Sequence, residues 1–250
     1  MHDLDSRIQA YLRAHALRMA DHERNGPFLS AFDEVSDNPY RNYAVPDDGA
    51  KPSAADVVAL EAAFIRRRRK PRLEYIAAAA PEVEAALLAR GFAAEQRYPI
   101  LTCLAGEVRD LPGIDVVEAR ADADIVAAAE ALSEAYGNDA PYPDPLRRLM
   151  EQGGVLAIVH DGGAVVGAGM ATPQHEGVTE VAGIGVRENF RRRGIAGALT
   201  AFLTRTAFAQ GATLAWLTPG SDGAERVYER AGFRRASAQL HISKDVSFDL

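Results

Sequence analysis

The feature that most constrains the fold is a stretch in which the pattern of apolar residues changes from that of a strand to that of a helix. Residues 178–186 have the pattern of a strand. After Gly194, apolar residues recur at a spacing of about 3.6, which predicts a helix with one buried face. That face comprises Ile195, Ala198, Leu199, Phe202, Leu203 and Thr206. The sequence therefore predicts a strand that enters a helix through a tight turn.

The turn, residues 186–197, has the sequence V-R-E-N-F-R-R-R-G-I-A-G and predicts a phosphate site. The first amides of a helix have no partners within the helix, and the helix dipole adds partial positive charge there. Gly194 and Gly197 lack side chains, so that a ligand can approach the backbone closely. Arg191, Arg192 and Arg193 add positive charge. Taken alone, this short pattern also fits a solvated helix start.

A second motif, S-D-G-A-E-R-V-Y-E-R-A-G-F, occupies residues 221–233. Its Tyr228 lies four residues before the pair Gly232 and Phe233. Together with Arg191-Arg192-Arg193-Gly194-Ile195-Ala196, which matches Arg/Gln-x-x-Gly-x-Gly/Ala, this order resembles the GNAT (general N-acetyltransferase) superfamily. The resemblance covers residues 114–243. Where the family often has Asn, this chain has Ser221, whose hydroxyl can still form hydrogen bonds but offers fewer donors.

The resemblance implies an α/β fold with a GNAT-like mixed, mostly antiparallel central sheet flanked by helices. It implies acetyl-CoA as cosubstrate and a primary amine as acceptor, with the loop amides holding the pyrophosphate. It further implies that the backbone at Val186 pairs with the pantetheine arm and that Tyr228 donates the proton to the leaving thiolate. A packed aromatic residue is the other interpretation of Tyr228. The expected cofactor-binding residues are Ile184, Val186, Arg191, Arg192, Arg193, Gly194, Ile195, Ala196, Gly197 and Ser221.

Glu180 is the candidate base, since several family members keep a catalytic glutamate at this place on the strand. Glu180 lies six residues before Val186, and the two side chains should share a face unless a bulge intervenes. A glutamate at a strand edge that faces water explains the residue equally well. The family's acceptor pocket points to Tyr136, Asn138, Asp139 and Tyr142, with Asp144 nearby and His241 opposite. Acidic and aromatic groups suit a cationic amine.

The N-terminal half repeats part of this pattern at a shift of 141 positions. Val45 falls on Val186, Leu73 on Leu214, and Gly91-Phe92 on Gly232-Phe233. The copy lacks the chemistry, because Leu87 replaces the tyrosine and the turn at 47–53 carries aspartates. We therefore expect a degenerate, structural GNAT-like domain at 1–105, a linker at 106–113 and a catalytic domain at 114–250. Chance similarity of two helix–strand units is the alternative.

Composition narrows the function further. A net charge of −7 argues against a nucleic-acid partner, and no apolar run is long enough to span a membrane. The N-terminus lacks the apolar core of a signal peptide, and a single cysteine excludes an internal disulfide. His and Cys spacings suggest no metal site. We therefore expect a cytoplasmic monomer or homodimer that acts on a small-molecule amine. An acyl-CoA sensor without turnover and a structural protein are the alternatives.

Overall fold

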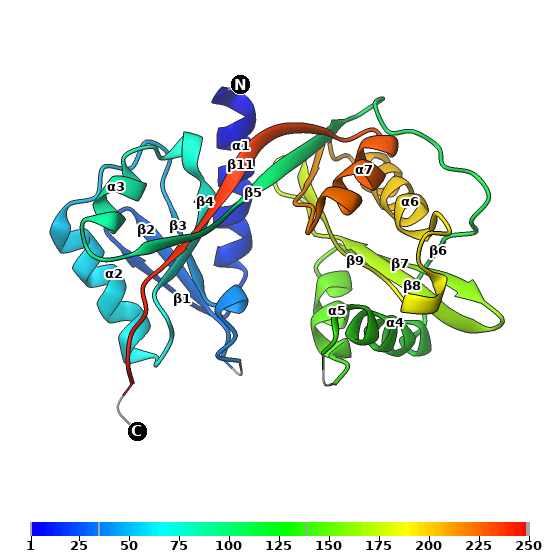
Figure 1. The fold of residues 1–250 in the computed structure, drawn as a ribbon, viewed down its shortest axis with the longest axis horizontal. Coiled ribbons are helices and arrows are strands. Elements are labelled where there is room, and N and C mark those ends of the chain that lie inside the picture. Colours follow the sequence, from blue (N-terminus) through cyan, green and yellow to red (C-terminus); the bar gives the residue numbers. More distant parts are fainter. Residues whose placement is uncertain (1, 35, 139, 249–250) are drawn as a thin grey trace. The chain divides into compact units, whose positions relative to one another are not determined.

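In the computed structural model, residues 2–34, 36–138 and 140–248 are described. The chain forms two compact units, one of residues 1–99 and 236–250 and the other of residues 100–235. Each unit contains a sheet flanked by helices (Figure 1). The mixed, mostly antiparallel α/β fold expected from the sequence is confirmed. The first unit takes the last strand, and the second unit begins at Ile100, within the strand that precedes the predicted linker at 106–113.

The sheet of the second unit has the strand order β5-β10-β9-β8-β7-β6. Its neighbours pair in antiparallel fashion except β9 and β10, which are parallel. The strands are β5 (Ala93–Leu104), β6 (Val117–Glu118), β7 (Val155–Asp161), β8 (Ala164–Ala171), β9 (Val178–Val186) and β10 (Leu214–Leu217). The sequence predicts a strand at residues 114–119, and only the two residues of β6 form one.

Helices cover both faces of this sheet. Helices α6 (Ile195–Ala209) and α7 (Asp222–Arg230) lie over one face, and α4 (Asp122–Tyr136) and α5 (Pro143–Glu151) over the other (Figure 1). Each face has its own hydrophobic core, centred on α6 for the first and on α4 for the second. Strands β7 and β8 therefore carry apolar side chains into both cores, whereas the apolar side chains of β9 in these clusters lie in the core of α6.

The first unit has the strand order β1-β2-β3-β4-β11. The strands are β1 (Asp21–Asn25), β2 (Phe28–Phe32), β3 (Tyr43–Pro46), β4 (Arg72–Ile76) and β11 (Arg234–Ser243). The helices are α1 (His2–Leu17), α2 (Ala54–Arg66) and α3 (Val83–Leu88). Every residue of β2 is buried, because α1 and α2 both pack against it and cover the strand on both faces.

The apolar residues from Ile8 to Met19 predict a first helix, and the pair Gly26-Pro27 predicts its end. The predicted end is wrong. Helix α1 ends at Leu17, and Gly26 (φ +56°) lies in the turn between β1 and β2. Strand β1 consists of five polar residues whose side chains alternate between half-buried and exposed. A sequence pattern finds strands by their apolar residues, and this edge strand offers none.

The repeat predicted from the sequence recurs in the elements themselves. A shift of 141 places the first residue of α2, Ala54, on Ile195 of α6, and the first residue of β5, Ala93, on Arg234 of β11. The pairing, however, is exchanged. Strand β5 follows the first copy but pairs with β10, whereas β11 follows the second copy but pairs with β4. Each unit is therefore completed by the strand that ends the other copy.

A buried cluster of charged side chains links β11 to β4 in the first unit. The fully buried Arg72 donates to Glu95 at 3.0 Å and forms an ion pair with Glu74. It also donates to Nδ1 of the buried His241 at 2.7 Å, so that the neutral ring carries its proton on Nε2. Burial, aided by the charge of Arg72, lowers the pKa of His241 to about 4. The ring is therefore held neutral.

The exchange predicts that a fragment of residues 106–250 will be insoluble. This fragment lacks residues 101–104 of β5, so that β10 loses its antiparallel partner and the buried Leu101 and Cys103 leave the core. An unpaired apolar edge strand promotes aggregation. Expression of 106–250 beside 100–250 tests this, since the longer fragment restores the strand. A soluble 106–250 fragment with a cooperative unfolding transition would contradict the prediction.

The neutral His241 predicts a loss of stability in mild acid. The pKa of a histidine is about 6.5 in an unfolded chain, and here it is about 4 in the folded state. Between these values the unfolded state binds more protons, so that the free energy of unfolding falls by about 2 kcal/mol from pH 7 to pH 5. Urea unfolding across this range should show a flatter profile for His241→Gln than for the exposed control His160→Gln. Equal slopes in both variants would disprove the assignment.

Candidate active site

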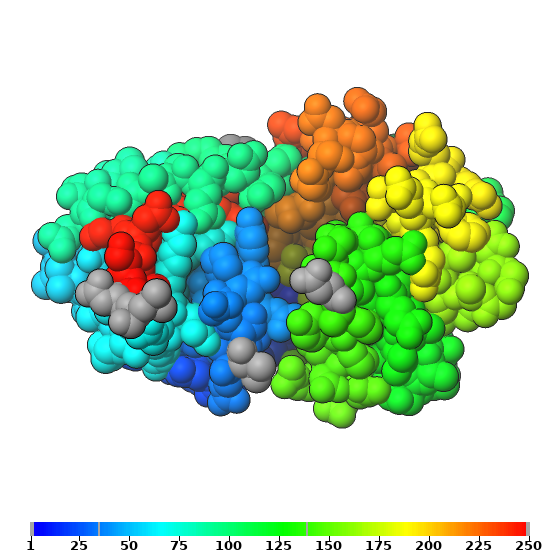
Figure 2. Space-filling view, turned by 60° about the horizontal axis from the view of Figure 1, so that its bottom comes forward, coloured from blue at the N-terminus to red at the C-terminus, as the bar shows by residue number. Residues whose placement is uncertain are grey.

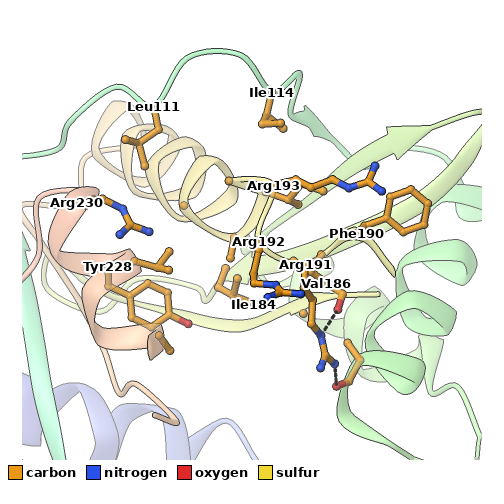
Figure 3. Close-up of a pocket in the computed structure, with 18 of the residues that line it drawn as sticks. Leu111, Ile114, Ile184, Val186, Phe190, Arg191, Arg192, Arg193, Tyr228 and Arg230 are labelled. Carbon is orange, nitrogen blue, oxygen red and sulfur yellow. Dashed lines mark hydrogen bonds between the residues drawn. The ribbon is translucent and has the colours of Figure 1, made fainter. Parts of the chain in front are cut away.

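The second unit contains a cavity of about 660 Å³ at the start of α6 (Figure 3). Its walls come from β9, from the turn between β9 and α6, from α7 and from the segment that follows β5. All ten predicted cofactor-binding residues line this cavity. They are Ile184, Val186, Arg191, Arg192, Arg193, Gly194, Ile195, Ala196, Gly197 and Ser221, together with the predicted proton donor Tyr228.

The first turn of α6 presents open backbone amides to the cavity. Gly194 is the N-cap with φ +88° and makes no side-chain capping bond, because glycine has no side chain to offer. A Cβ built on Gly194 meets no other atom within 4 Å, so the space in front of this turn is open. Arg192 also has positive φ, +63°, which folds the chain sharply into the helix. Amides arranged in this way can bind a phosphate.

The four arginines that line the cavity differ in their partners. Arg191 is held in place, because Nε donates to the Val186 carbonyl at 3.1 Å and Nη2 to the Ala135 carbonyl at 3.2 Å. Arg193 donates to the Asn189 carbonyl at 3.1 Å and lies 3.6 Å from Asp161. Among the described residues, Arg192 and Arg230 have no ion-pair partner, and the described lining holds no carboxylate. The cavity is therefore strongly positive.

A β-bulge in β9 changes which side chains face the cavity. Ala168 pairs with Gly185 and Met170 with Ala182, so that two residues of β9, Gly183 and Ile184, stand opposite one residue of β8. Gly183 adopts φ +59° at this point. The extra residue reverses the alternation of faces along the strand. Val181 and Val186, which are five residues apart, consequently lie in the same core.

The expectation that Glu180 and Val186 share a face is therefore wrong. Glu180 adjoins Val181, which packs on the α6 side, so the half-buried Glu180 side chain leaves the opposite face of the sheet. Glu180 does not line the cavity. A sequence reading could not place the bulge, because one glycine in a strand pattern does not reveal whether a residue has been inserted.

Beyond Glu180, one edge of β9 has no neighbouring strand. Strand β10 pairs with β9 only from Val178 to Glu180. The Arg187 amide donates to the Val166 carbonyl on β8, so the polar groups of Val186 and Ile184 point away from β8, toward the cavity. Both carbonyls have donors, since the Tyr136 hydroxyl bonds the Ile184 carbonyl at 3.1 Å and Arg191 bonds that of Val186. The amides of Ile184 and Val186 at this edge therefore remain available to a ligand in the cavity.

Tyr228 faces this edge from α7 (Figure 3). Burial, and to a smaller extent the nearby Tyr136, raises the pKa of Tyr228 to about 12. The hydroxyl therefore keeps its proton at every ordinary working pH. Ser221 is the N-cap of α7, where its Oγ accepts from the Ala224 amide at 3.2 Å. Ser221 can still donate its own proton to a ligand.

The predicted acceptor residues do not all meet. Tyr136 lines the cavity with 57% of its surface exposed, whereas Asn138 and Tyr142 do not line it. Asp139 lies outside the described residues. Asp144 pairs with Arg147, and His241 belongs to the cluster of the first unit. The sequence analysis missed Leu111, Pro112, Ile114, Phe190 and Arg230 as lining residues. It treated Leu111 and Pro112 as linker and Ile114 as the start of the catalytic domain, and only their apolar character could have indicated a wall.

The corresponding turn of the first unit is closed by its own side chains. Ser53 caps α2, accepting from the Asp56 amide at 3.2 Å, and Asp56 in return accepts from the Ser53 amide at 2.8 Å. Asp47 and Asp48 form ion pairs with Arg24 and Arg13. The amides that are open in α6 are thus occupied in α2. At the shift of 141 positions, Ala50, Lys51 and Pro52 stand where the second unit has its three arginines.

The described part of the chain holds no group of three or more His, Cys, Asp or Glu side chains that could bind a metal ion. None of its helices combines the length and the apolar character needed to cross a membrane.

Comparison with known proteins identifies the family. Residues 125–233 match the sequence model of the Acetyltransferase (GNAT) family. The structure resembles a GCN5-related N-acetyltransferase from Kribbella flavida with a TM-score of 0.82 and 26% identity, covering 98% of this chain and 96% of that chain. No curated protein matches the sequence.

Two more distant structures share the fold alone. A GCN5-related N-acetyltransferase from Sphaerobacter thermophilus has a TM-score of 0.64 and 18% identity over 90% of this chain and 79% of that chain. A tandem GNAT protein from the clavulanic acid biosynthesis pathway has a TM-score of 0.60 and 14% identity over 88% and 79%. These likenesses include the N-terminal part, which has a GNAT-like fold. Residues 125–233 therefore form a GNAT acetyltransferase domain, and the protein is an acyltransferase.

Proposed function

We propose that the protein transfers an acetyl group from acetyl-CoA to the primary amine of a small molecule. One observation carries this proposal. An uncapped, arginine-rich helix start, an open strand edge and a protonated tyrosine meet in a single cavity. They supply the three things that the reaction needs, which are a phosphate site, amide donors for the thioester oxygen and a proton for the leaving sulfur.

The binding step uses the backbone more than side chains. The amides at the start of α6 hold the pyrophosphate, with Arg192 supplying mobile charge. The pantetheine arm lies along the open edge of β9, as an added strand would. There the Ile184 and Val186 amides donate to the thioester oxygen. Tyr136 and Arg191 support this role by occupying both carbonyls, which keeps acceptor groups of the edge away from a developing negative charge.

In the transfer, the carbon–nitrogen bond forms and the carbon–sulfur bond breaks. Tyr228 donates its proton to the sulfur, and the proton that the amine gives up restores the tyrosine. The amine must be neutral when it attacks. Glu180 is the candidate base offered by the sequence, and its position on the other face of the sheet predicts a contribution smaller than that of Tyr228. Tyr136 provides an aromatic surface for the acceptor beside Tyr228.

The placement of Glu180 also favours a second candidate function. A cavity that binds acyl-CoA without a carboxylate in its described lining suits a sensor or regulatory protein without turnover. A screen of amine acceptors for release of free CoA separates the two, because a sensor releases none. We further propose that the protein is cytoplasmic, acts as a monomer or homodimer, and binds neither nucleic acid nor membranes, in line with its net charge of −7.

The phosphate turn predicts one CoA site per chain that depends on Gly194. Gly194→Val introduces a side chain into the open space before the α6 amides and strains a residue with φ +88°. Loss of charge-assisted hydrogen bonds worth about 1.5–3 kcal/mol should weaken CoA binding by at least roughly tenfold. Gly163→Val is the matched control, since Gly163 has φ +85° and open space but lies in the β7–β8 turn.

Calorimetric titration measures both quantities. We expect a stoichiometry near one for the wild type and the Gly163 variant. Two equivalent sites per chain would show that the N-terminal copy also binds CoA. Equal affinity in the Gly194 and Gly163 variants would remove the phosphate turn from the proposal.

The position of Tyr228 predicts that Tyr228→Phe slows chemistry and spares CoA affinity. The change removes only the hydroxyl, and general acid catalysis is typically worth about 10²–10⁴-fold in rate. Because burial raises the pKa of Tyr228 to about 12, its loss should lower the rate equally from pH 6 to pH 9. Single-turnover acetyl transfer to the best acceptor found measures this without interference from product release.

Glu180→Gln tested in the same assay identifies the base. If the base is elsewhere, this variant retains the wild-type rate at high pH and shows an unchanged pH profile. A rate for Tyr228→Phe equal to that of the wild type would make Tyr228 a packing residue. A larger loss in Glu180→Gln than in Tyr228→Phe would reverse the two roles.

A further inference from the structure

A cluster of polar side chains outside the cavity lies on the sheet of the first unit, where β4 and β11 pair. Glu74 and His241 stand directly opposite each other in the register of the two strands, so that their side chains leave the same face of the sheet. Neither residue lines the cavity of the second unit. The sequence analysis placed His241 opposite an acceptor pocket and did not consider Glu74.

The two carboxylate oxygens of Glu74 have different surroundings. Oε1 accepts from the buried Arg72, whereas Oε2 lies 3.7 Å from Nε2 of His241, which is too long for a hydrogen bond. Nε2 carries the ring proton, because Nδ1 accepts from Arg72. Among the described residues Nε2 has no partner, although His241 is only 7% exposed. A buried donor of this kind costs free energy unless a water or a ligand satisfies it.

The surroundings of Glu74 are short of positive charge. Arg72 serves two carboxylates, since it also donates to Glu95. Glu95 has a second cation, Lys70 at 3.7 Å, whereas Glu74 has only the shared guanidinium, and the neutral His241 adds no charge. Burial raises the pKa of Glu74, which indicates that its ionised form is incompletely compensated. A cation beside Oε2 would supply the missing charge.

The pair is partly open to solvent and has aromatic rings beside it. The carboxylate side chain keeps 15% of its surface exposed. Tyr98 packs against the His241 ring with the ring centres 4.6 Å apart, and the exposed Tyr40 lies over the Arg72 guanidinium. Tyr40 belongs to the short helix η1 (Pro39–Arg41), which lies on the surface seen in Figure 2. Aromatic rings near a carboxylate suit an ammonium ion.

We propose that Glu74 and His241 bind a small amino alcohol in the first unit. The ligand hydroxyl accepts from His241 Nε2, and its ammonium group donates to Glu74 Oε2. A hydroxyl and an ammonium group on adjacent carbons can reach both atoms at once. One ligand thereby satisfies the buried donor and neutralises the carboxylate. The site does not depend on the acetyl transfer proposed above, because it shares no residue with that cavity.

Three probes of similar size test the two contacts separately in the full chain. 2-Aminoethanol carries both groups, n-propylamine carries only the ammonium, and 1-propanol carries only the hydroxyl. Each is titrated at fixed pH and salt, while NMR follows the ring signals of isotope-labelled histidine. His241→Gln assigns the His241 signal by its loss, and the exposed His160 is the internal control.

We expect 2-aminoethanol to shift the His241 signal in a saturable manner and to leave that of His160 unchanged. The other two probes should bind at least about tenfold more weakly, because each lacks one hydrogen bond to a buried group. An equal response to all three probes, or no saturable shift of the His241 signal, would mean that water alone fills the gap and would overturn the proposal. This comparison uses the wild type, so it decides even if a variant fails to fold.

Two matched variants test the carboxylate. Glu74→Gln and Glu95→Gln each remove one negative charge from the surroundings of Arg72, but only Glu74 lies beside His241 Nε2. We expect Glu74→Gln to weaken binding of 2-aminoethanol by about tenfold or more and Glu95→Gln to weaken it by less than about threefold. Equal weakening in both variants would reveal a general effect of charge and would also overturn the proposed site.

Discussion

The site depends on the parting of two parallel strands. Strands β9 and β10 pair only as far as Glu180, and from there the β9 edge has no partner strand. Unpaired amides inside a protein are costly unless water or a ligand satisfies them. The bulge at Gly183 turns the strand at this point, and the cavity fills the space that a continued β10 would have taken. The cavity and the free amides that line it both result from the end of the pairing between β9 and β10 at Glu180.

The first unit shows what the same fold does without that chemistry. Its turn between β3 and α2 occupies the place of the phosphate turn, yet a capping box satisfies the amides that α6 leaves open. A serine in place of Gly194 is enough to provide the cap, since a hydroxyl at that position bonds the amides that a phosphate would bond. The first amides of both helices need hydrogen-bond acceptors. In α2 a side chain supplies the acceptor, whereas in α6 the amides remain open to a ligand.

Much of the fold could be predicted from the sequence, and the reasons for the failures are physical. Strand β9 has the bounds expected, and α6 begins directly after Gly194 as expected, because the spacing of apolar residues reflects their burial. Strand β1 was not predicted because its residues are polar. The exchange of β5 and β11 was not predicted because the sequence of a strand does not specify its neighbour in the sheet. The phosphate turn and Tyr228 come from local motifs. The sheet face on which Glu180 lies depends on a bulge, and the position of Leu111 at the cavity depends on a long-range contact with α6. Local sequence patterns encode neither.

Exchange of the final strands has a consequence for the site as well as for the fold. Strand β5 pairs with β10 and is followed directly by residues 105–116, part of which lines the cavity. The strand that completes the sheet therefore also leads the chain into the site. A net charge of −7 repels an anion at a distance, while the arginines at the cavity attract it at close range, where screening by salt is weaker. Affinity for a polyanionic ligand therefore has to come from groups placed within the cavity. The open amides of the α6 turn and the arginines without ion-pair partners are such groups. The overall charge of the protein does not supply this affinity.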